Sequence, residues 1–150
     1  MPQDLPLAEI TLRRYEKPYN ADKREIVRKI CLSLGLLQPG DSRDVVVDIL
    51  MILEKARKNK EKLNSDEIKK RVEDNRKSHN LELKGVAESN IRRQLKKLRD
   101  LMIVDKKENL YNLSEFSNLS EIFENKIEKF LLPQCTERIK EYLREIDKSS

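Results

Sequence analysis

The chain has few of the side chains that most often carry catalysis, metal binding or covalent crosslinking. Its 150 residues include one histidine, two cysteines and no tryptophan. His79 lies in a polar connector, so it is expected to be a surface residue rather than a general base. Cys31 and Cys135 are too far apart in the sequence to indicate a disulfide framework or a zinc knuckle. We therefore expect no enzymatic activity, no cofactor and no metal.

Long apolar segments are also missing. The sequence has no run of about 18 hydrophobic residues, so no membrane-spanning helix is predicted. The first residues, MPQDLPLAE, lack the basic and then apolar pattern of a secretion signal. The predicted location is the cytoplasm, where two unpaired thiols stay reduced.

Glycine and proline are scarce, with three and five residues, whereas charged residues make up 39% and hydrophobic residues 37%. The hydrophobic residues recur at helical spacing, which argues against disorder. A chain of this length can form one domain around a hydrophobic core. We expect a mainly α-helical fold.

Apolar stripes predict four helices in the first hundred residues, at about 21–37, 42–59, 64–78 and 87–101. The second is expected to be the most buried, because its apolar face extends over several turns. Asn20 is the expected N-cap of the first helix, and Asn64 with Glu67 forms a capping box at the third. Cys31 falls in the stripe of the first helix and is expected to be a small core residue.

The remainder of the chain predicts a hairpin and two more helices. Segment 103–113 is expected to form a β-hairpin around a five-residue polar tip, Asp105–Asn109. Two helices at about 117–132 and 136–147 should be separated by Pro133. The apolar stripe on residues 119–131 is left over after the main core, so it predicts dimerisation through the C-terminal helices.

The helix at 87–101 concentrates the positive charge of the chain. From Ser89 to Met102 there are five cations and one acid, an excess close to the net charge of +5 of the whole protein. A basic outer face on a helix that is anchored to a core suits binding to a polyanion. Its apolar residues recur at spacings of four, three and four and so share the opposite face: Ile91, Leu95, Leu98 and Met102.

A helix, a turn, a second amphipathic helix and a hairpin, in this order, form the layout of a winged helix-turn-helix. On this basis residues 1–20 are a basic N-terminal arm, and residues 21–114 are the winged helix-turn-helix domain. Residues 115–150 are C-terminal helices that can serve as a dimerisation element. The arm touches phosphate, packs through Tyr15 and Tyr19, or is partly disordered.

The predicted ligand is double-stranded DNA. Arginine and asparagine can read base edges, lysine mainly contacts phosphate, and the first turn of a helix offers free N–H groups. Arg93 and Lys96 lie opposite the predicted core and are the best candidates, whereas the hairpin should reach the neighbouring backbone. The predicted DNA-binding residues are Ser89, Asn90, Arg92, Arg93, Lys96, Lys97, Lys106, Lys107 and Asn109.

Other functions stay open at this point. A winged helix can also be an adaptor that docks on an acidic protein surface without sequence-specific DNA binding. Single-stranded RNA is less favoured because few aromatic residues are available for base stacking. Binding of a small-molecule effector has no support in the sequence.

The segment ESNIRRQLKKLRDLMIVDKKENLYNLSEF resembles archaeal winged-helix transcription regulators. EITLRRYEKP and SLGLLQPGDSRDVVVDIL are similar to one archaeal winged-helix DNA-binding family, which includes euryarchaeal activators of archaellum operons. The resemblance covers nearly the whole chain and implies promoter binding near the basal transcription machinery. Ala87 departs from the common pattern, in which Ser or Thr often caps this helix. The implied recognition-helix positions are Asn90, Arg92, Arg93, Lys96 and Lys97.

Overall fold

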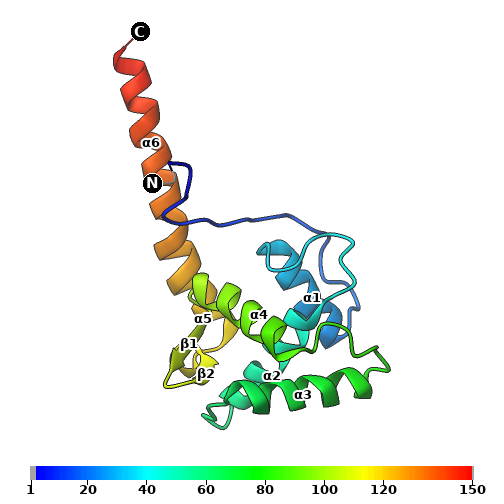
Figure 1. The fold of residues 1–150 in the computed structure, drawn as a ribbon. Coiled ribbons are helices and arrows are strands. Elements are labelled where there is room, and N and C mark those ends of the chain that lie inside the picture. Colours follow the sequence, from blue (N-terminus) through cyan, green and yellow to red (C-terminus); the bar gives the residue numbers. More distant parts are fainter. Residues whose placement is uncertain (1–2, 150) are drawn as a thin grey trace.

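The structure, a computed structural model that describes residues 3–149, is mainly helical with one small antiparallel sheet (Figure 1). The predictions of a mainly helical chain and of a hairpin after the basic helix are confirmed. The first elements are α1 (Lys23–Ser33), α2 (Val45–Arg57), α3 (Ser65–Ser78), α4 (Glu88–Asp100), β1 (Val104–Lys107) and β2 (Leu110–Leu113). A short turn, η1 (Ser114–Phe116), leads into α5 (Leu119–Ile122), η2 (Phe123–Leu131) and α6 (Leu132–Lys148).

Helix α2 forms the centre of the core, as predicted. It packs against α1, α3, α4 and β2. Its residues are buried on nearly every side, which is the expected state of a helix that is apolar around most of its circumference. The core therefore fixes α4 and the hairpin relative to the same central helix.

Helix α3 starts where the sequence predicted, whereas both ends of α1 differ from the predicted bounds of 21–37. Asn64 and Glu67 form the predicted capping box. Helix α1 is capped by Asp22, whose carboxylate accepts a hydrogen bond from the Glu25 N–H at 2.8 Å, so the predicted Asn20 cap is wrong. The helix ends early because Gly35 has a φ of 71° and packs so tightly on Thr11 that a Cβ there would lie 2.5 Å from the Thr11 Cβ.

The hairpin tip is shorter than predicted. Glu108 and Asn109 alone form the turn, with φ values of 53° and 66°. Positive φ at both central residues gives the two-residue turn that matches the twist of paired strands, and asparagine tolerates it well. Lys106 and Lys107 consequently lie in β1, and Lys107 pairs with Leu110. An isolated bridge between Leu63 and Tyr111 adds a third short segment beside the hairpin.

The predicted break at Pro133 is wrong. Elements α5, η2 and α6 run on as one long helix, and Pro133 occupies the first turn of α6 (Figure 1). The preceding η2 is a π-helical segment. The hydrogen-bond register of a π-helix differs from that of an α-helix, and proline, which has no N–H, is tolerated where the new register starts.

Cys31 is the core residue that the sequence predicted, and it should resist modification. The side chain has no exposed surface, and burial raises the pKa of its thiol to about 12. The thiol therefore stays protonated at pH 8, and the protonated form is not the nucleophile. In a Cys135→Ser variant, which leaves Cys31 as the one thiol, a maleimide reagent should react only after urea unfolds the protein. Rapid modification of the folded variant would contradict this burial.

Candidate nucleic-acid interface

Helix α4 is anchored to the body by a fully buried apolar face. Ile91, Leu95 and Leu98 have no exposed surface, and the helix packs against α2, α3 and β1. The predicted fourth member of this face, Met102, lies beyond the end of the helix with a φ of 62° and is only partly buried. The three buried side chains fix the rotation of α4 about its axis and therefore determine which residues it presents outward.

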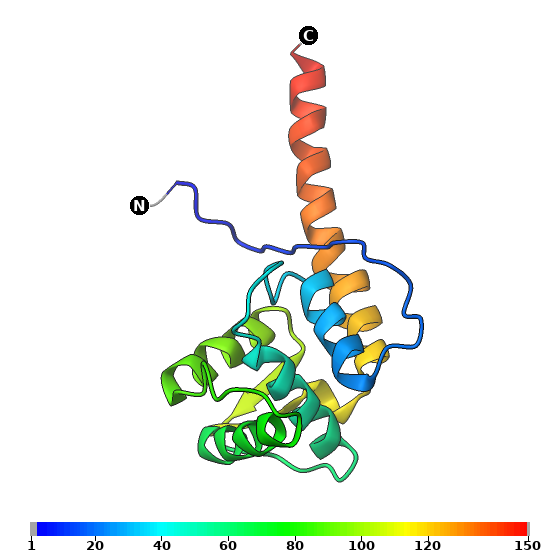
Figure 2. The same ribbon diagram turned by 90° about the vertical axis from the view of Figure 1, so that its right-hand side faces the viewer.

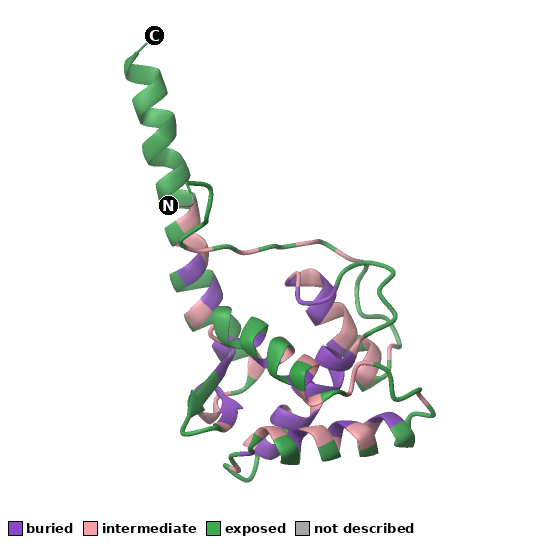
Figure 3. Cartoon of the chain, viewed as in Figure 1, coloured by how far each residue is buried: buried purple, intermediate pink, exposed green. Residues whose placement is uncertain are grey.

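The outward face of α4 is cationic and exposed (Figure 3). All four predicted cations of this helix lie in exposed positions. Arg99, which was not among the predicted DNA-binding residues, is exposed on the same helix. The structure thus brings together the following cations: Arg92, Arg93, Lys96, Lys97 and Arg99.

Two of these cations have acidic neighbours on their own helix. Arg92 lies 2.6 Å from Glu88, and Lys96 lies 3.2 Å from Asp100. The side chains nevertheless remain exposed, by 58% for Arg92 and 71% for Lys96. The hydrogen bond from Arg92 lowers the pKa of Glu88, so this acid stays ionised. Exposed pairs of this kind are weak and screened by salt, so both cations can exchange an acid for a phosphate.

In the first turn of α4, the side chain of Asn90 is held by hydrogen bonds within the protein. Its Nδ2 donates a hydrogen bond to the Gly85 carbonyl at 2.7 Å, and its Oδ1 accepts one from Gln94 at 3.1 Å. Gly85 has a φ of 76°, and a Cβ there would lie 3.1 Å from the Asn90 amide. In this conformation Asn90 holds the connector instead of pointing toward a ligand. Ser89, by contrast, is exposed beside the N-terminal N–H groups of the helix.

The polar side chains of the hairpin point in different directions. Lys106 and Lys107 are both exposed, but as neighbours in a strand they point to opposite faces. The Lys106 Nζ lies 5.7 Å from the centroid of the Tyr111 ring. Asn109 is exposed in the turn. A single duplex beside the hairpin would therefore meet the turn and one of the two lysines.

A buried ionic cluster that the sequence did not predict is centred on Asp48 of α2. The Asp48 carboxylate has no exposed surface and accepts hydrogen bonds from Arg24 at 2.6 Å, Arg76 at 2.8 Å and Asn75 at 2.8 Å. Arg76 also donates from its Nε to the Glu82 carbonyl at 2.6 Å, in the connector that leads to α4. The cluster therefore ties α1, α2 and α3 to the segment that positions the candidate site.

Asp44 completes this cluster at the start of α2. It accepts hydrogen bonds from Arg76 at 2.9 Å and from Arg24 at 3.1 Å. Burial raises the pKa of Asp44, but the two guanidinium groups outweigh it and hold the pKa below its usual value. The signal in the sequence was an acid inside an apolar run, together with Arg76 at helical spacing from the inward-facing Val72.

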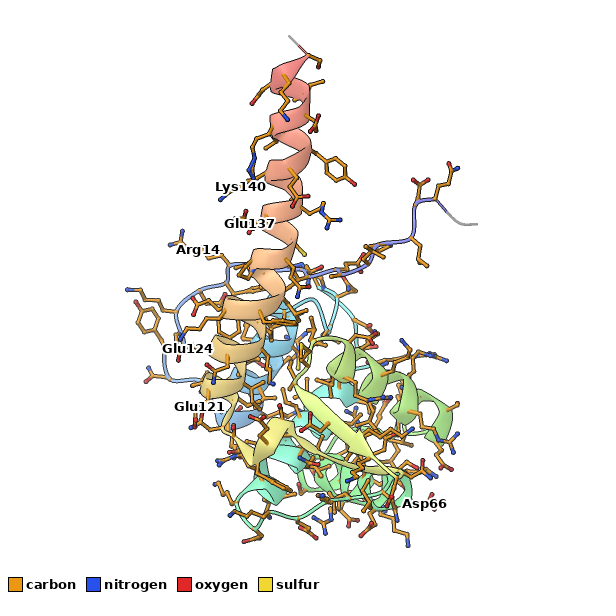
Figure 4. The ribbon with its side chains drawn as sticks, turned by 90° about the vertical axis from the view of Figure 1, so that its left-hand side faces the viewer. Arg14, Asp66, Glu121, Glu124, Glu137 and Lys140 are labelled. Carbon is orange, nitrogen blue, oxygen red and sulfur yellow. The ribbon has the colours of Figure 1, made fainter. Side chains whose placement is uncertain are left out.

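The N-terminal arm packs along α1 through its central residues. Arg13 donates to the Leu32 carbonyl at 2.9 Å and to the Gln38 side chain at 2.8 Å, near the end of α1. The Lys29 ammonium lies 4.9 Å from the centroid of the Tyr15 ring. These contacts fit the packing interpretation for Tyr15, whereas Tyr19 is 75% exposed and does not pack as predicted. Arg14, in contrast, is exposed and points away from the body (Figure 4).

An apolar cavity of about 820 Å³, which the sequence did not predict, lies between the arm, α1 and the helix that starts with α5. Its walls include Ile26 and Ile30 of α1, Ile122 and Phe123 of the long helix, and Tyr15 of the arm. None of its lining residues comes from α3, α4 or the two strands. The cavity is therefore separate from the cationic face.

Comparison with known proteins gives no relative: no family model, curated protein or solved structure matches this chain. Within residues 3–149, none of the helices combines the length and apolar character that crossing a membrane requires. The same described part of the chain has no group of three metal-ligating side chains. The geometry of α4 is therefore the main guide to function.

Proposed function

We propose that the chain is a sequence-specific, double-stranded DNA-binding transcription regulator that reads the major groove with α4. The observation that carries this proposal is the division of α4 into two faces. One face is completely buried through Ile91, Leu95 and Leu98, and the other exposes five cations. A helix fits the major groove of B-DNA, where arginine can contact guanine and lysine can contact phosphate.

We infer that residues 21–114 form a winged helix-turn-helix, in which α3 and α4 are the helix pair and the hairpin is the wing. The order of α2, α3, α4, β1 and β2 supports this assignment, as does the bridge of Leu63 to Tyr111 beside the hairpin. The archaeal regulator family that the sequence resembles has the same layout. One departure is the connector at 79–87, which is longer than the usual short turn between the two helices.

The proposal assigns different tasks to the exposed residues. Arg93 and Lys96 lie opposite the buried face and are assigned to base edges or phosphates inside the groove. Arg92 and Lys97 flank them and are assigned to phosphates. Ser89 and the hairpin contact the backbone at the two ends, whereas Asn90 supports the connector.

A double substitution of α4 tests the proposal. Arg93→Ala with Lys96→Ala should weaken binding to a duplex, selected from a random pool by the wild-type protein, roughly 10- to 100-fold at about 150 mM salt. Both side chains are exposed, so the melting temperature should change little. Fluorescence anisotropy measures the affinity, and calorimetry measures the melting temperature.

The matched control removes two cations from η2. Lys126→Ala with Lys129→Ala should leave the affinity unchanged, because η2 contributes no residue to the cationic face of α4 or to the hairpin. Equal binding by the wild type and the α4 variant would count against the proposal. Weak binding by the wild type that does not depend on sequence would favour the adaptor function instead.

A further inference from the structure

Most of helix α6 stands outside the body of the protein. Its 17 residues span about 25 Å, and every residue from Thr136 to Ser149 is exposed (Figures 1 and 3). Figure 2 shows the same helix projecting beyond α1 and the arm. An isolated helix of this length is only marginally stable in water, because most helical stability in proteins comes from packing of an apolar face.

An apolar stripe runs along this projecting helix. Three of its members are large and strongly exposed: Ile139 by 57%, Tyr142 by 70% and Ile146 by 64%. The whole stripe recurs at spacings of three and four, which is the a and d pattern of a coiled-coil seam. Its members are Leu132, Cys135, Ile139, Tyr142 and Ile146.

This stripe replaces the dimerisation surface that the sequence indicated. That surface was placed on residues 119–131, but Ile122, Ile127 and Leu131 are buried in the core of the chain itself. Phe123 and Phe130 stay exposed at the edge of that surface, by 38% and 47%, whereas from Thr136 to Ser149 the helix is exposed on every side.

We propose that α6 pairs with α6 of a second copy in an antiparallel, two-stranded coiled coil. A second copy supplies a seam of equal length and spacing, so the two surfaces are self-complementary about a two-fold axis. The remaining positions suit this pairing because, apart from Leu143 at the edge of the seam, those from Thr136 to Lys148 are polar or charged. Glu137 and Lys140, for example, project from one side of α6 (Figure 4) and occupy heptad positions outside the seam.

Charge favours the antiparallel direction. When Ile139 lies opposite Tyr142 of the second copy, Cys135 lies opposite Ile146, and Arg138 faces Glu145 across the edge of the seam. The two-fold axis produces this pair twice. A parallel pairing in register would instead set Arg138 beside Leu143 and lose both pairs.

The charged residues at this edge can exchange their ion-pair partners within one copy for partners on the second copy. Within one copy Arg138 pairs with Glu141 at 3.0 Å, and Glu145 pairs with Lys148 at 3.4 Å. All four side chains are more than half exposed, so these contacts are weak and easily replaced. The antiparallel dimer would hold the two bodies at opposite ends of the seam, each with its own α4.

Sedimentation equilibrium at about 100 μM tests the pairing. The wild type should sediment as a dimer, and Ile139→Glu with Tyr142→Glu should sediment as a monomer. Both residues are exposed in one copy, so the core of the variant should keep its circular dichroism and its burial of Cys31. Lys140→Glu, a charge change outside the seam, should remain dimeric. A wild-type monomer, or a dimer that the double variant preserves, would overturn the proposal.

Disulfide trapping tests the direction, with copper phenanthroline as the oxidant that takes two electrons from each pair of thiols. Cys31 is buried, so in the wild type only Cys135 is available. In the antiparallel dimer two Cys135 side chains are far apart, and the wild type should stay uncrosslinked. Ile146→Cys should give a covalent dimer, because the introduced thiol faces Cys135 of the second copy.

Each trapping result decides the direction. A covalent wild-type dimer would indicate parallel helices, and the absence of crosslinking in Ile146→Cys would contradict the proposed register. Neither trapping nor sedimentation uses DNA. Failure of the pairing therefore leaves the proposed DNA-binding function standing, and failure of DNA binding leaves the pairing standing.

Discussion

Replacing Asp48 by alanine is expected to lower the free energy of unfolding by about 3–5 kcal/mol, because it leaves buried cations without their main partner. Arg76 is 3% exposed and would keep only Asp44 and the Glu82 carbonyl as acceptors. Arg24 would likewise lose its shortest hydrogen bond, at 2.6 Å. Urea denaturation followed by circular dichroism measures the change.

Asp74→Ala is the matched control, since Asp74 is an exposed acid on α3. A surface substitution of this kind should change stability by no more than about 0.5 kcal/mol. A loss below about 1 kcal/mol for Asp48→Ala would mean that the guanidinium groups find water or other acceptors. The cluster would then contribute little to holding α1, α2 and α3 together.

The position of the candidate site could be predicted from the sequence because it depends on periodicity. Ile91, Leu95 and Leu98 repeat at the helical period, and their burial alone determines that Arg93 and Lys96 face outward. Local signals of similar strength predicted the capping box at Asn64. In these cases the residues that make the contact are close in the sequence, so the pattern contains the information.

The sequence did not predict the features that depend on contacts between residues far apart in the chain. Arg24, Asp48 and Arg76 come from three helices, and only packing of those helices brings their charges together. The use of Asn90 follows from the path of the connector at Gly85. Proline usually ends an α-helix, but no local pattern in the sequence indicates the π-helical segment that precedes Pro133 and allows the helix to continue.

Duplex binding is expected to weaken about 500-fold when salt is raised from about 50 to 200 mM. The exposed cations available for phosphates are four on α4 and one of the two hairpin lysines: Arg92, Arg93, Lys96, Lys97, and Lys106 or Lys107. Each neutralised phosphate adds about 0.9 to the slope of log affinity against log salt, so five contacts give a slope near 4.5. Anisotropy titrations at several salt concentrations measure this slope.

Substitution of Lys96 and Lys97 together by alanine should reduce the slope by about 1.8, since two phosphate contacts are lost. The control Lys126→Ala with Lys129→Ala should leave it unchanged. A slope below about 2 for the wild type would contradict the assignment, because α4 would then meet few phosphates. The magnitude of the slope also tests whether the dimer places both α4 helices on one duplex, because its slope would then exceed the value for five contacts.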